Sequence, residues 1–297
     1  MINDKILDFI KTKPEVIDVI GYGSGVKKQN GYTNDIKKQI DLIVTVEDAK
    51  KWHKENYKNN KEEYSNLGFL ISNPLYNIGT NINYITNIKY KDDTFKLGII
   101  DKKDMLFDLY SWSNFYMAGR CQKPIEKVIC DKKLNNAIYY NRLNALKCAL
   151  ILNYGNIITE DALYKTICSL SYIGDIRMTF HCENPNKINN IVSASMEEFR
   201  KMYNEVNEDL FINKDGYIYN NNSALIKDFF DFPTCMLSYL KNNIEELTCE
   251  QLKQCILEYL KMTNLKSSIA QPIKSMTLNG TGKSIEYLKE KVKKGKM

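Results

Sequence analysis

The sequence lacks the features of several common classes of protein. It has no run of about 18 apolar residues, the least that a membrane-spanning helix needs. None of its eight cysteines forms a Cys-x-x-Cys pair, so no structural zinc site is expected and, without a secretory signal, the thiols are predicted to be reduced. Its two histidines form no Ser-His-Asp pattern. These absences argue against a membrane-spanning protein, a zinc-stabilised fold and a serine hydrolase.

The composition is that of a folded globular protein. Of 297 residues, 43% are hydrophobic and 26% are charged, which leaves room for two modest domains. The formal net charge of +6 is mildly basic and suits anionic partners such as nucleotides, acidic lipids or nucleic acid. Composition alone does not choose among these partners.

Hydrophobic periodicity predicts a mixed α+β arrangement in the first part of the chain. Pro14 ends the first helix, and Lys91–Asp93 is the turn of a hairpin. We expect these elements to form one domain, residues 1–125. The expected elements are helices at 2–12, 47–60 and 102–117, strands at 16–21 and 40–46, and a hairpin of 83–90 with 94–100.

The second part, residues 126–265, is predicted to be mostly helical. A small hairpin is expected at Asp215–Tyr219, and Thr248 with Gln251 has the capping-box pattern that opens a helix. Helices with a small hairpin favour a winged-helix-like domain, which often binds DNA but also serves as a packing scaffold. The expected helices cover 134–153, 159–171, 195–207, 234–247 and 248–262.

The final segment, 266–297, ends in a basic amphipathic stretch from Lys283 to Met297. Ile285, Leu288 and Val292 fall on one face of a helix, and lysines fill much of the rest. One interpretation is a solvated terminal helix. The other is a helix lying on an anionic bilayer, where each surface lysine adds about 1 kcal/mol of attraction.

A strand followed by a Gly-Ser-Gly turn is the most informative motif. The apolar stretch Val16–Ile20 leads into Gly23–Gly25, and a second apolar strand carries Asp41 near its start. Glycines let the backbone approach phosphates, whose oxygens accept from backbone N–H groups and a serine hydroxyl. A carboxylate on the next strand suits the magnesium that bridges those phosphates. The pattern is typical of polymerase-beta-type nucleotidyltransferases, although Ile43 replaces their second carboxylate.

Blocks along nearly the whole chain resemble one family. Two of them, Ala118–Pro124 and Ser171–Met178, have no generic structural meaning, so their joint occurrence is specific. The chain is similar to the mitochondrial translocator-assembly-and-maintenance type of CDP-diacylglycerol synthase, a phosphatidate cytidylyltransferase. The other blocks are Tyr22–Val26 with Gln29, Ile40–Asp41, Val46–Asp48, Trp52–His53 with Asn56, Asn60, Tyr64–Ser65, Lys96–Ile100, Asp108–Leu109, Trp112 with Asn114, Tyr116–Met117, Ser267–Ile269 with Gln271, and Gly282–Ser284.

The resemblance implies an enzyme that transfers CMP from CTP to phosphatidic acid, with Mg²⁺ as its cofactor. It implies CTP, phosphatidic acid and an anionic membrane surface as partners, and no nucleic acid. The start, Met1–Lys5, lacks the Arg-rich character of a transit peptide. We therefore expect a bacterial member, peripheral on the cytoplasmic face of the cell membrane. A eukaryotic member is expected on the matrix side of the mitochondrial inner membrane.

The resemblance and the chemistry of phosphoryl transfer assign roles to particular residues. Asp41 is the expected metal ligand, with Asp108 and Asp175 as further catalytic carboxylates. The alternatives are a structural role for Asp108 and a salt bridge between domains for Asp175 with Arg177. The expected nucleotide and phosphate contacts are Gly23, Ser24, Gly25, Gln29, His53, Asn56, Lys96, Arg120, Lys123, Arg177 and Lys283.

Two other functions stay open. One is nucleotidyl transfer to RNA or protein, which the same superfamily performs, although no basic-aromatic strand motif for base stacking is evident. The other is a non-enzymatic factor that assembles membrane complexes, which only the missing carboxylate at Ile43 favours. Magnesium-dependent CTP binding separates the two enzymatic functions from this third one.

Overall fold

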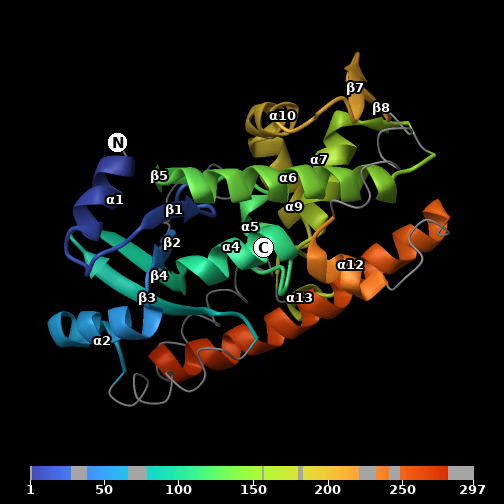
Figure 1. Ribbon diagram of the computed structural model, residues 1–297. Coiled ribbons are helices and arrows are strands. Elements are labelled where there is room, and N and C mark those ends of the chain that lie inside the picture. The colour runs from blue at the N-terminus through green and yellow to red at the C-terminus, as the bar shows by residue number, and fades with distance from the viewer. Residues whose placement is uncertain are drawn as a thin grey trace.

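A five-stranded mixed sheet organises the N-terminal half of the chain (Figure 1). The computed structural model describes residues 2–27, 39–65, 79–155, 157–179, 183–220, 232–240 and 248–279. The strands are β1 (Asp18–Tyr22), β2 (Ile40–Val46), β3 (Ile82–Tyr90), β4 (Asp93–Asp101) and β5 (Glu126–Ile129). Their order is β3-β4-β2-β1-β5, and every neighbouring pair is antiparallel except β2 with β4.

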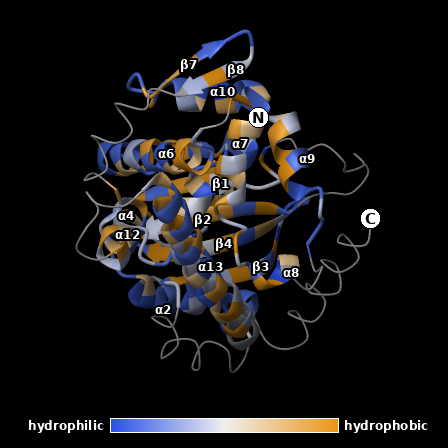
Figure 2. Ribbon diagram, turned by 90° about the vertical axis from the view of Figure 1, so that its right-hand side faces the viewer, coloured by the Kyte–Doolittle hydropathy of each residue, from blue (hydrophilic) through white to orange (hydrophobic). Residues whose placement is uncertain are grey.

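Different helices cover the two faces of this sheet. On one face, Val19, Leu42 and Val44 share a core with α1 (Ile2–Ile10) and α2 (Ala49–Asn59). On the other, Ile20 and Ile43 share a core with α4 (Lys102–Ser111) and α6 (Lys132–Leu152). In Figure 2 these helices carry both hydrophobic and hydrophilic stretches, as helices with one buried side do.

Helices and a small sheet make up the second half of the molecule (Figure 1). The small sheet has three strands in the order β6-β8-β7. One continuous core joins Ile20 and Ile43 of the large sheet to Leu163 and Ile167 in this half. The elements are β6 (Ile158–Thr159), α7 (Glu160–Ser169), α8 (Ile176–Thr179), α9 (Lys187–Ala194), α10 (Met196–Asn204), β7 (Phe211–Lys214), β8 (Tyr217–Asn220), α12 (Thr234–Leu240) and α13 (Cys249–Asn279).

The long helix α13 connects the two halves. Ser267 Oγ donates to the carbonyl of Asn114 at 2.8 Å, and Asn264 Nδ2 donates to the carbonyl of Leu170 at 2.8 Å. In Figure 1 the helix runs below α4 and β3, and it also packs on β3. Side-chain amides and hydroxyls of α13 therefore bind backbone carbonyls from segments far away in the sequence.

The expected α+β character and most of the expected elements are confirmed. Both long strands, the β3–β4 hairpin and the capping box are present, with Gln251 N donating to Thr248 Oγ1 at 3.3 Å. The sheet extends through β5, beyond the boundary expected at residue 125, and α13 continues across the boundary expected at 265. The domain names polymerase-beta-type and winged-helix-like stay predictions. The expected helical residues 241–247 and 283–297 lie outside the described residues.

Two expected helix ends are wrong. The helix expected at 102–117 ends at Ser111, because Trp112 adopts a left-handed backbone (φ 57°) and the following turn is bound by Asp108. The helix expected to end at 262 continues to Asn279, because its later turns pack on β3 even though they include Pro272.

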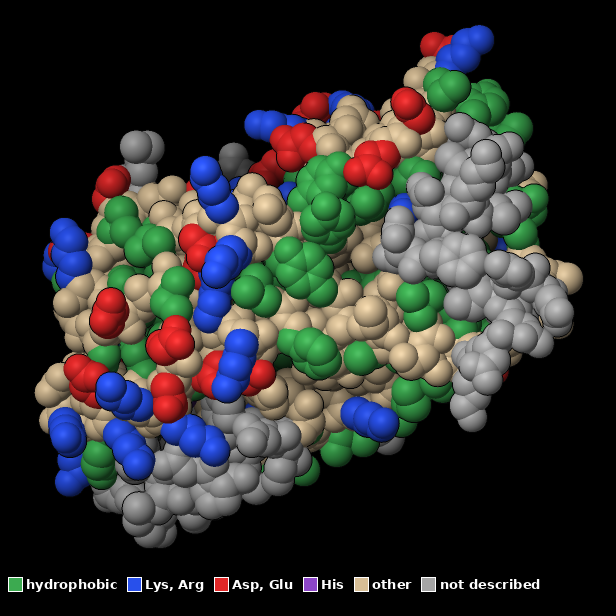
Figure 3. Space-filling view, in the orientation of Figure 1, with side chains coloured by type: hydrophobic (Ala, Val, Ile, Leu, Met, Phe, Trp, Pro, Cys, Tyr) green, Lys and Arg blue, Asp and Glu red, His purple; other side chains and the backbone are tan. Residues whose placement is uncertain are grey.

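Aromatic side chains lie exposed on α4 and α6. Phe107, Tyr110 and Tyr140 are each at least 43% exposed, and the rings of Tyr110 and Tyr140 have centroids 6.0 Å apart. Hydrophobic side chains gather over the middle of the face shown in Figure 3, while charged side chains crowd the part over the large sheet. Within the described ranges, no helix combines the length and the apolar character needed to cross a bilayer.

Candidate active site

The turn after β1 brings a glycine directly beneath the carboxylate of Asp41. Gly23 has a left-handed φ of 74°, and its carbonyl accepts from Val26 N at 3.1 Å and Lys27 N at 2.9 Å. A Cβ on Gly23 would lie 3.1 Å from Asp41 Oδ2. Both the backbone conformation and the close carboxylate favour glycine here. The predicted turn and its carboxylate are therefore adjacent in space.

At Gly25 a steric contact, and not the backbone conformation, requires glycine. A Cβ at this position would lie 2.0 Å from the carbonyl oxygen of Gln39, so the turn packs backbone against backbone at the entrance to β2. Ser24 lies between these two glycines and is partly exposed. Gln29, expected to contact the nucleotide, lies outside the described residues.

Strand pairing places Tyr22 and Lys96 on either side of Asp41. Tyr22 is opposite Asp41 across the antiparallel pair, and Lys96 is beside it across the parallel pair. Lys96 Nζ lies 4.0 Å from Asp41 Oδ1 and 4.4 Å from the ring centroid of Tyr84. Ile43, two residues along the same face, is buried in the core. The strand therefore offers one carboxylate to a ligand, as the sequence predicts.

Arg120 lies among tyrosine rings, one of which belongs to Tyr22, the residue opposite Asp41 in the strand register. It belongs to the short helix α5 (Ala118–Cys121), and its guanidinium carbon lies 3.6 Å from the ring centroid of Tyr116 and 5.6 Å from that of Tyr22. Its Nη1 donates to the carbonyl of Tyr116 at 2.6 Å, while its buried Nε has no hydrogen-bond acceptor among the described residues. Arg120 and Asp41 thus share the ring of Tyr22 as a neighbour.

Lys123 follows directly after α5 and binds the Ser171 segment. Its Nζ donates to Ser171 Oγ at 2.5 Å and lies 5.2 Å from the ring centroid of Tyr172. Gly119 permits this contact, because a Cβ there would lie 2.6 Å from the Cβ of Ser171. Burial lowers the pKa of Lys123 to about 8. The two sequence blocks with no generic structural meaning therefore meet at this point.

Asp175 and Arg177 bind each other. Arg177 Nε donates to both carboxylate oxygens of Asp175, at 3.0 and 3.2 Å, and its backbone N donates to Oδ1 at 2.9 Å. Burial opposes the charge on Arg177, yet its hydrogen bond to Asp175 raises the pKa of Arg177 above its ordinary value. Gly174 (φ 76°) packs against the backbone of Lys261 in α13. This ion pair is local to one turn, which makes it a brace of that turn and not a contact between domains.

Asp108 accepts hydrogen bonds from the turn that precedes Arg120. Asp108 is buried, Oδ1 accepts from the backbone N of Asn114 and of Phe115 at 2.9 and 2.8 Å, and Oδ2 accepts from Met117 N and Ala118 N at 2.8 and 3.0 Å. Both oxygens are thus occupied by backbone donors. The geometry favours the structural alternative for Asp108 over direct catalysis.

His53 and Asn56 lie on the other face of the sheet from Asp41. Both are buried on α2, where His53 Nδ1 lies 3.0 Å from the hydroxyl of Tyr64 and Asn56 Nδ2 donates to Glu63 Oε2 at 2.8 Å. Glu63, in the 3₁₀ turn η1 (Lys61–Glu63), also pairs with Lys13. Burial lowers the pKa of His53 to about 3, so the ring is neutral. The structure does not bring these residues to the Gly23–Gly25 turn.

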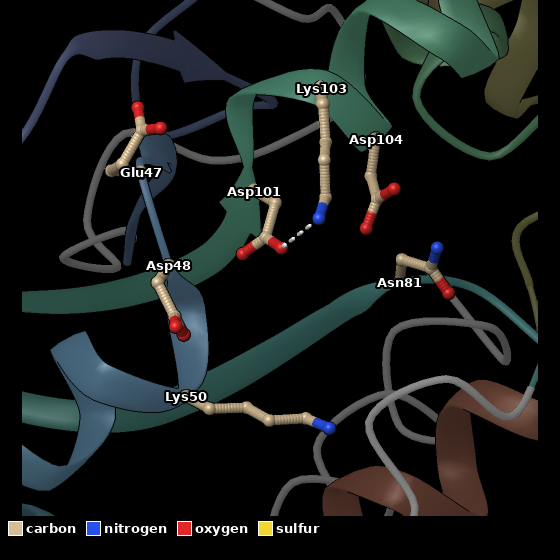
Figure 4. A pocket seen from close by; sticks show the side chains of 7 residues that line it. All are labelled: Glu47, Asp48, Lys50, Asn81, Asp101, Lys103 and Asp104. Carbon is tan, nitrogen blue, oxygen red and sulfur yellow. Dashed lines mark ion pairs between the residues drawn. The ribbon is translucent and has the colours of Figure 1, made fainter.

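A polar hollow of about 350 Å³ lies at the other end of the parallel strands (Figure 4). Asp101 Oδ1 accepts from Ala49 N at 2.6 Å, and Asp48 caps α2 by accepting from Lys51 N at 2.9 Å. Four carboxylates and two lysines line the hollow, and this excess of negative charge repels a triphosphate. The hollow is therefore a poor nucleotide site. Its lining residues are Glu47, Asp48, Lys50, Asn81, Asp101, Lys103 and Asp104.

Asp41 is the best metal ligand that the site offers. Among the described residues, no three His, Cys, Asp or Glu side chains lie together closely enough to hold a metal. Magnesium in phosphoryl-transfer sites is commonly held by one or two carboxylates, with substrate phosphates and waters completing its shell. One carboxylate beside the Gly23–Gly25 turn fits that ion. Lys283, expected to contact phosphate, lies outside the described residues.

The comparison with known families agrees with this geometry. Residues 4–230 match the family model described as mitochondrial phosphatidate cytidylyltransferase. The chain belongs to this family. The family predicted from the sequence blocks is therefore confirmed, and its description is that of an enzyme.

Relatives in the same family come from several eukaryotes. The Schizosaccharomyces pombe protein is 40% identical over 203 residues, covering 67% of this chain and 51% of that protein. The Dictyostelium discoideum protein is 31% identical over 365 residues, covering 99% and 84%. The Saccharomyces cerevisiae protein is 32% identical over 281 residues, covering 91% and 64%. Each is described as a mitochondrial phosphatidate cytidylyltransferase, and they give no support to the expected bacterial source.

The tyrosines of this site were missed in the sequence. Tyr22, Tyr84, Tyr116 and Tyr172 each carry a lysine or arginine over the ring. The chain contains 20 tyrosines, so composition does not single these out. The available signal was position, because Tyr22, Tyr116 and Tyr172 each lie within or beside a block that carries the resemblance.

Proposed function

We propose that this protein transfers CMP from CTP to phosphatidic acid, giving CDP-diacylglycerol and pyrophosphate. The observation that carries the proposal is the carboxylate of Asp41 above the Gly23 turn, in a chain that belongs to the phosphatidate cytidylyltransferase family. The match to the S. pombe relative spans about half of that protein, so the activity is inferred for this chain from its own site as well.

The chemistry needs positioning more than proton transfer. A phosphate monoester has its second pKa near 6 and is largely dianionic at neutral pH. One of its oxygens attacks the α-phosphorus of CTP while the bond to the β-phosphate breaks and pyrophosphate leaves. No general base is required, which agrees with the placement of His53 on the far face of the sheet. Charge neutralisation and alignment are the main contributions left to the protein.

The residues of the turn and its neighbours divide this work. Backbone N–H groups of the Gly23–Gly25 turn bind triphosphate oxygens, and Asp41 is the residue that would hold magnesium. When bound, that ion would supply positive charge to neutralise the phosphates. Lys96 stabilises Asp41 from the adjacent strand and reaches the same phosphates.

We also propose a peripheral membrane location, since the acceptor is a lipid. The family description favours the mitochondrion over a bacterial cell membrane, and the matrix side of the inner membrane is part of this proposal. The basic stretch from Lys283 to Met297 supplies attraction to anionic lipid.

Pyrophosphate release tests the activity. The protein is incubated with CTP and magnesium, with and without phosphatidic acid in mixed micelles, and ATP replaces CTP in a parallel series. Release that requires both CTP and phosphatidic acid supports the proposal. A folded protein that binds CTP but releases no pyrophosphate with phosphatidic acid would contradict it, and RNA would be the next acceptor tried.

A further inference from the structure

Four basic side chains near the site differ in what balances their charge. Arg177 is bound by Asp175, and Lys96 lies 4.0 Å from Asp41. Arg120 and Lys123 have no carboxylate at ion-pair distance among the described residues, and their partners there are a carbonyl, a hydroxyl and aromatic rings. A sheltered cation with only neutral partners keeps its charge available for an anion.

The rings and the backbone hold these two cations in place without neutralising them. The guanidinium of Arg120 is stacked on Tyr116, and its Nη1 is fixed by the Tyr116 carbonyl, which leaves its buried Nε without an acceptor among the described residues. Lys123 donates one ammonium N–H to Ser171 Oγ, and its other two N–H groups stay available to a ligand. Cation–π contact and neutral hydrogen bonds thus preorganise two charged donors one helical turn apart.

Their contacts differ from those of the Gly23–Gly25 turn. Tyr22 is opposite Asp41 in the strand register, and the guanidinium carbon of Arg120 lies 5.6 Å from the centroid of the Tyr22 ring. Lys123 lies farther along, against Ser171 in the helical half. Attack on the α-phosphorus occurs in line with the leaving pyrophosphate, so the acceptor approaches from a side different from that of the triphosphate tail.

We propose that Arg120 and Lys123 form the subsite for the phosphate monoester of the acceptor lipid, distinct from the Gly23–Asp41 site that takes the triphosphate. This inference rests on the proposed function, since it names which substrate these cations bind. A dianionic monoester matches two fixed positive charges, and Arg120 supplies a planar fork to two oxygens while Lys123 supplies a point charge. Tyr22 is then shared between the two substrates.

Binding measured without turnover tests the subsite directly. Calorimetry with the full chain uses dihexanoyl phosphatidic acid as monomers, dihexanoyl phosphatidylcholine, inorganic phosphate, glycerol 3-phosphate and magnesium–CTP. The variants are Lys123→Met and Arg120→Lys. Their controls are Lys127→Met, which changes an exposed lysine of β5, and Arg200→Lys, which changes an arginine that donates to both carboxylate oxygens of Glu160 in the helical half. Losing one charge-assisted contact is expected to raise the dissociation constant for phosphatidic acid about tenfold or more in both variants. The dissociation constant for magnesium–CTP in these variants, and both constants in the controls, should stay within about twofold of those of the unchanged protein.

Each other outcome overturns a different statement. If both variants lose affinity for magnesium–CTP and for phosphatidic acid to the same extent, these cations bind the triphosphate, and the separate subsite is overturned. Inorganic phosphate binding as tightly as phosphatidic acid would overturn the lipid as the ligand. Phosphatidic acid that binds as expected, with no pyrophosphate release in micelles, would leave the subsite standing and overturn the proposed function.

Discussion

The two faces of the large sheet balance their buried charges in different ways. Behind α2, His53, Asn56, Tyr64 and Glu63 bind one another, and Lys13 closes the network with an ion pair. On the face of Asp41, the cations lie on tyrosine rings, and Arg120 leaves a buried Nε without an acceptor in the described part of the chain.

On our proposal, this contrast separates residues that stabilise the fold from residues that bind substrate. A buried polar network in which most groups bind one another stabilises a unique arrangement, although His53 Nε2 has no partner among the described residues. Sheltered cations whose partners are neutral add little to stability and cost desolvation energy. Both faces carry residues from the blocks that resemble the family, so the resemblance alone did not distinguish the two kinds.

Among the replacements on the face of Asp41, that of Asp41 itself should have the largest effect on turnover. Asp41→Asn keeps the shape of the side chain but removes the carboxylate above Gly23, and we expect turnover to fall on the order of a thousandfold. The melting temperature should stay within a few degrees, because Asp41 is partly exposed and its lysine partner lies 4.0 Å away. Pyrophosphate release and a thermal melt measure the two properties.

A matched carboxylate on the neighbouring strand serves as the control. Asp93→Asn removes an exposed ion pair with Lys5 at 2.9 Å and should leave turnover unchanged. Near-full activity of Asp41→Asn would show that the carboxylate is not the metal ligand.

Replacing Asp108 is expected to affect both stability and activity. In Asp108→Asn the new amide cannot accept from Met117 N and Ala118 N, and leaving these buried donors unpaired costs about 2 to 4 kcal/mol of unfolding free energy. The turn that carries Arg120 loosens with them, so the KM for phosphatidic acid should rise while the affinity for CTP changes little. Denaturant unfolding and steady-state kinetics measure these effects.

Asp18 offers a buried carboxylate for comparison. It accepts from Asp131 N at 2.9 Å and pairs with Lys102 at the far end of β1. Asp18→Asn should destabilise the fold to a similar degree without raising the KM for phosphatidic acid. If Asp108→Asn behaves in the same way, Asp108 supports the fold but does not position Arg120.

The fold was predictable where local patterns decide structure. The Gly23 turn, the strand of Asp41 and the capping box at Thr248 follow from glycine conformation, apolar alternation and side-chain capping, and each acts within a few residues. The end of α4 was not predictable in this way. The apolar spacing continues past Ser111, and the helix stops because Asp108 accepts from the N–H groups of residues 114, 115, 117 and 118.

The site was only partly predictable for the same reason. The pairing of Asp41 with the Gly23 turn follows from two adjacent strands. The separation of His53 from that turn depends on which face of the sheet α2 covers, and the sequence does not specify that face. Likewise, the difference between Arg177 and Arg120 depends on whether an acid lies within reach, which is a tertiary property.

For the face covered by α2, we predict how the stability of the fold depends on pH. Burial holds the folded pKa of His53 at about 3, against about 6.5 when unfolded, so the neutral ring stabilises the fold above pH 6.5. That stability is lost as pH falls toward 3, by about 2 kcal/mol between pH 7 and pH 5. His53→Gln should remove this part of the slope, whereas Tyr64→Phe, which leaves the histidine buried, should retain it. Urea unfolding at several pH values decides, and an unchanged slope in His53→Gln would contradict the assignment.

On the face of Asp41, the KM for phosphatidic acid should respond to pH in the opposite direction, with its loss of function at high pH, and the effect should be weaker. The pKa of Lys123 is about 8 because of burial, and the residues that face it are Arg120 and Lys187, with the thiols of Cys168 and Cys121, whose own pKa values are raised by burial. As pH rises through 8 the ammonium is lost, so the KM for phosphatidic acid should increase up to about tenfold between pH 7 and pH 9, with the KM for CTP nearly constant. Lys123→Arg should flatten this rise, because a guanidinium stays charged. An identical rise in Lys123→Arg would assign the titration to another group and remove Lys123 from the lipid subsite.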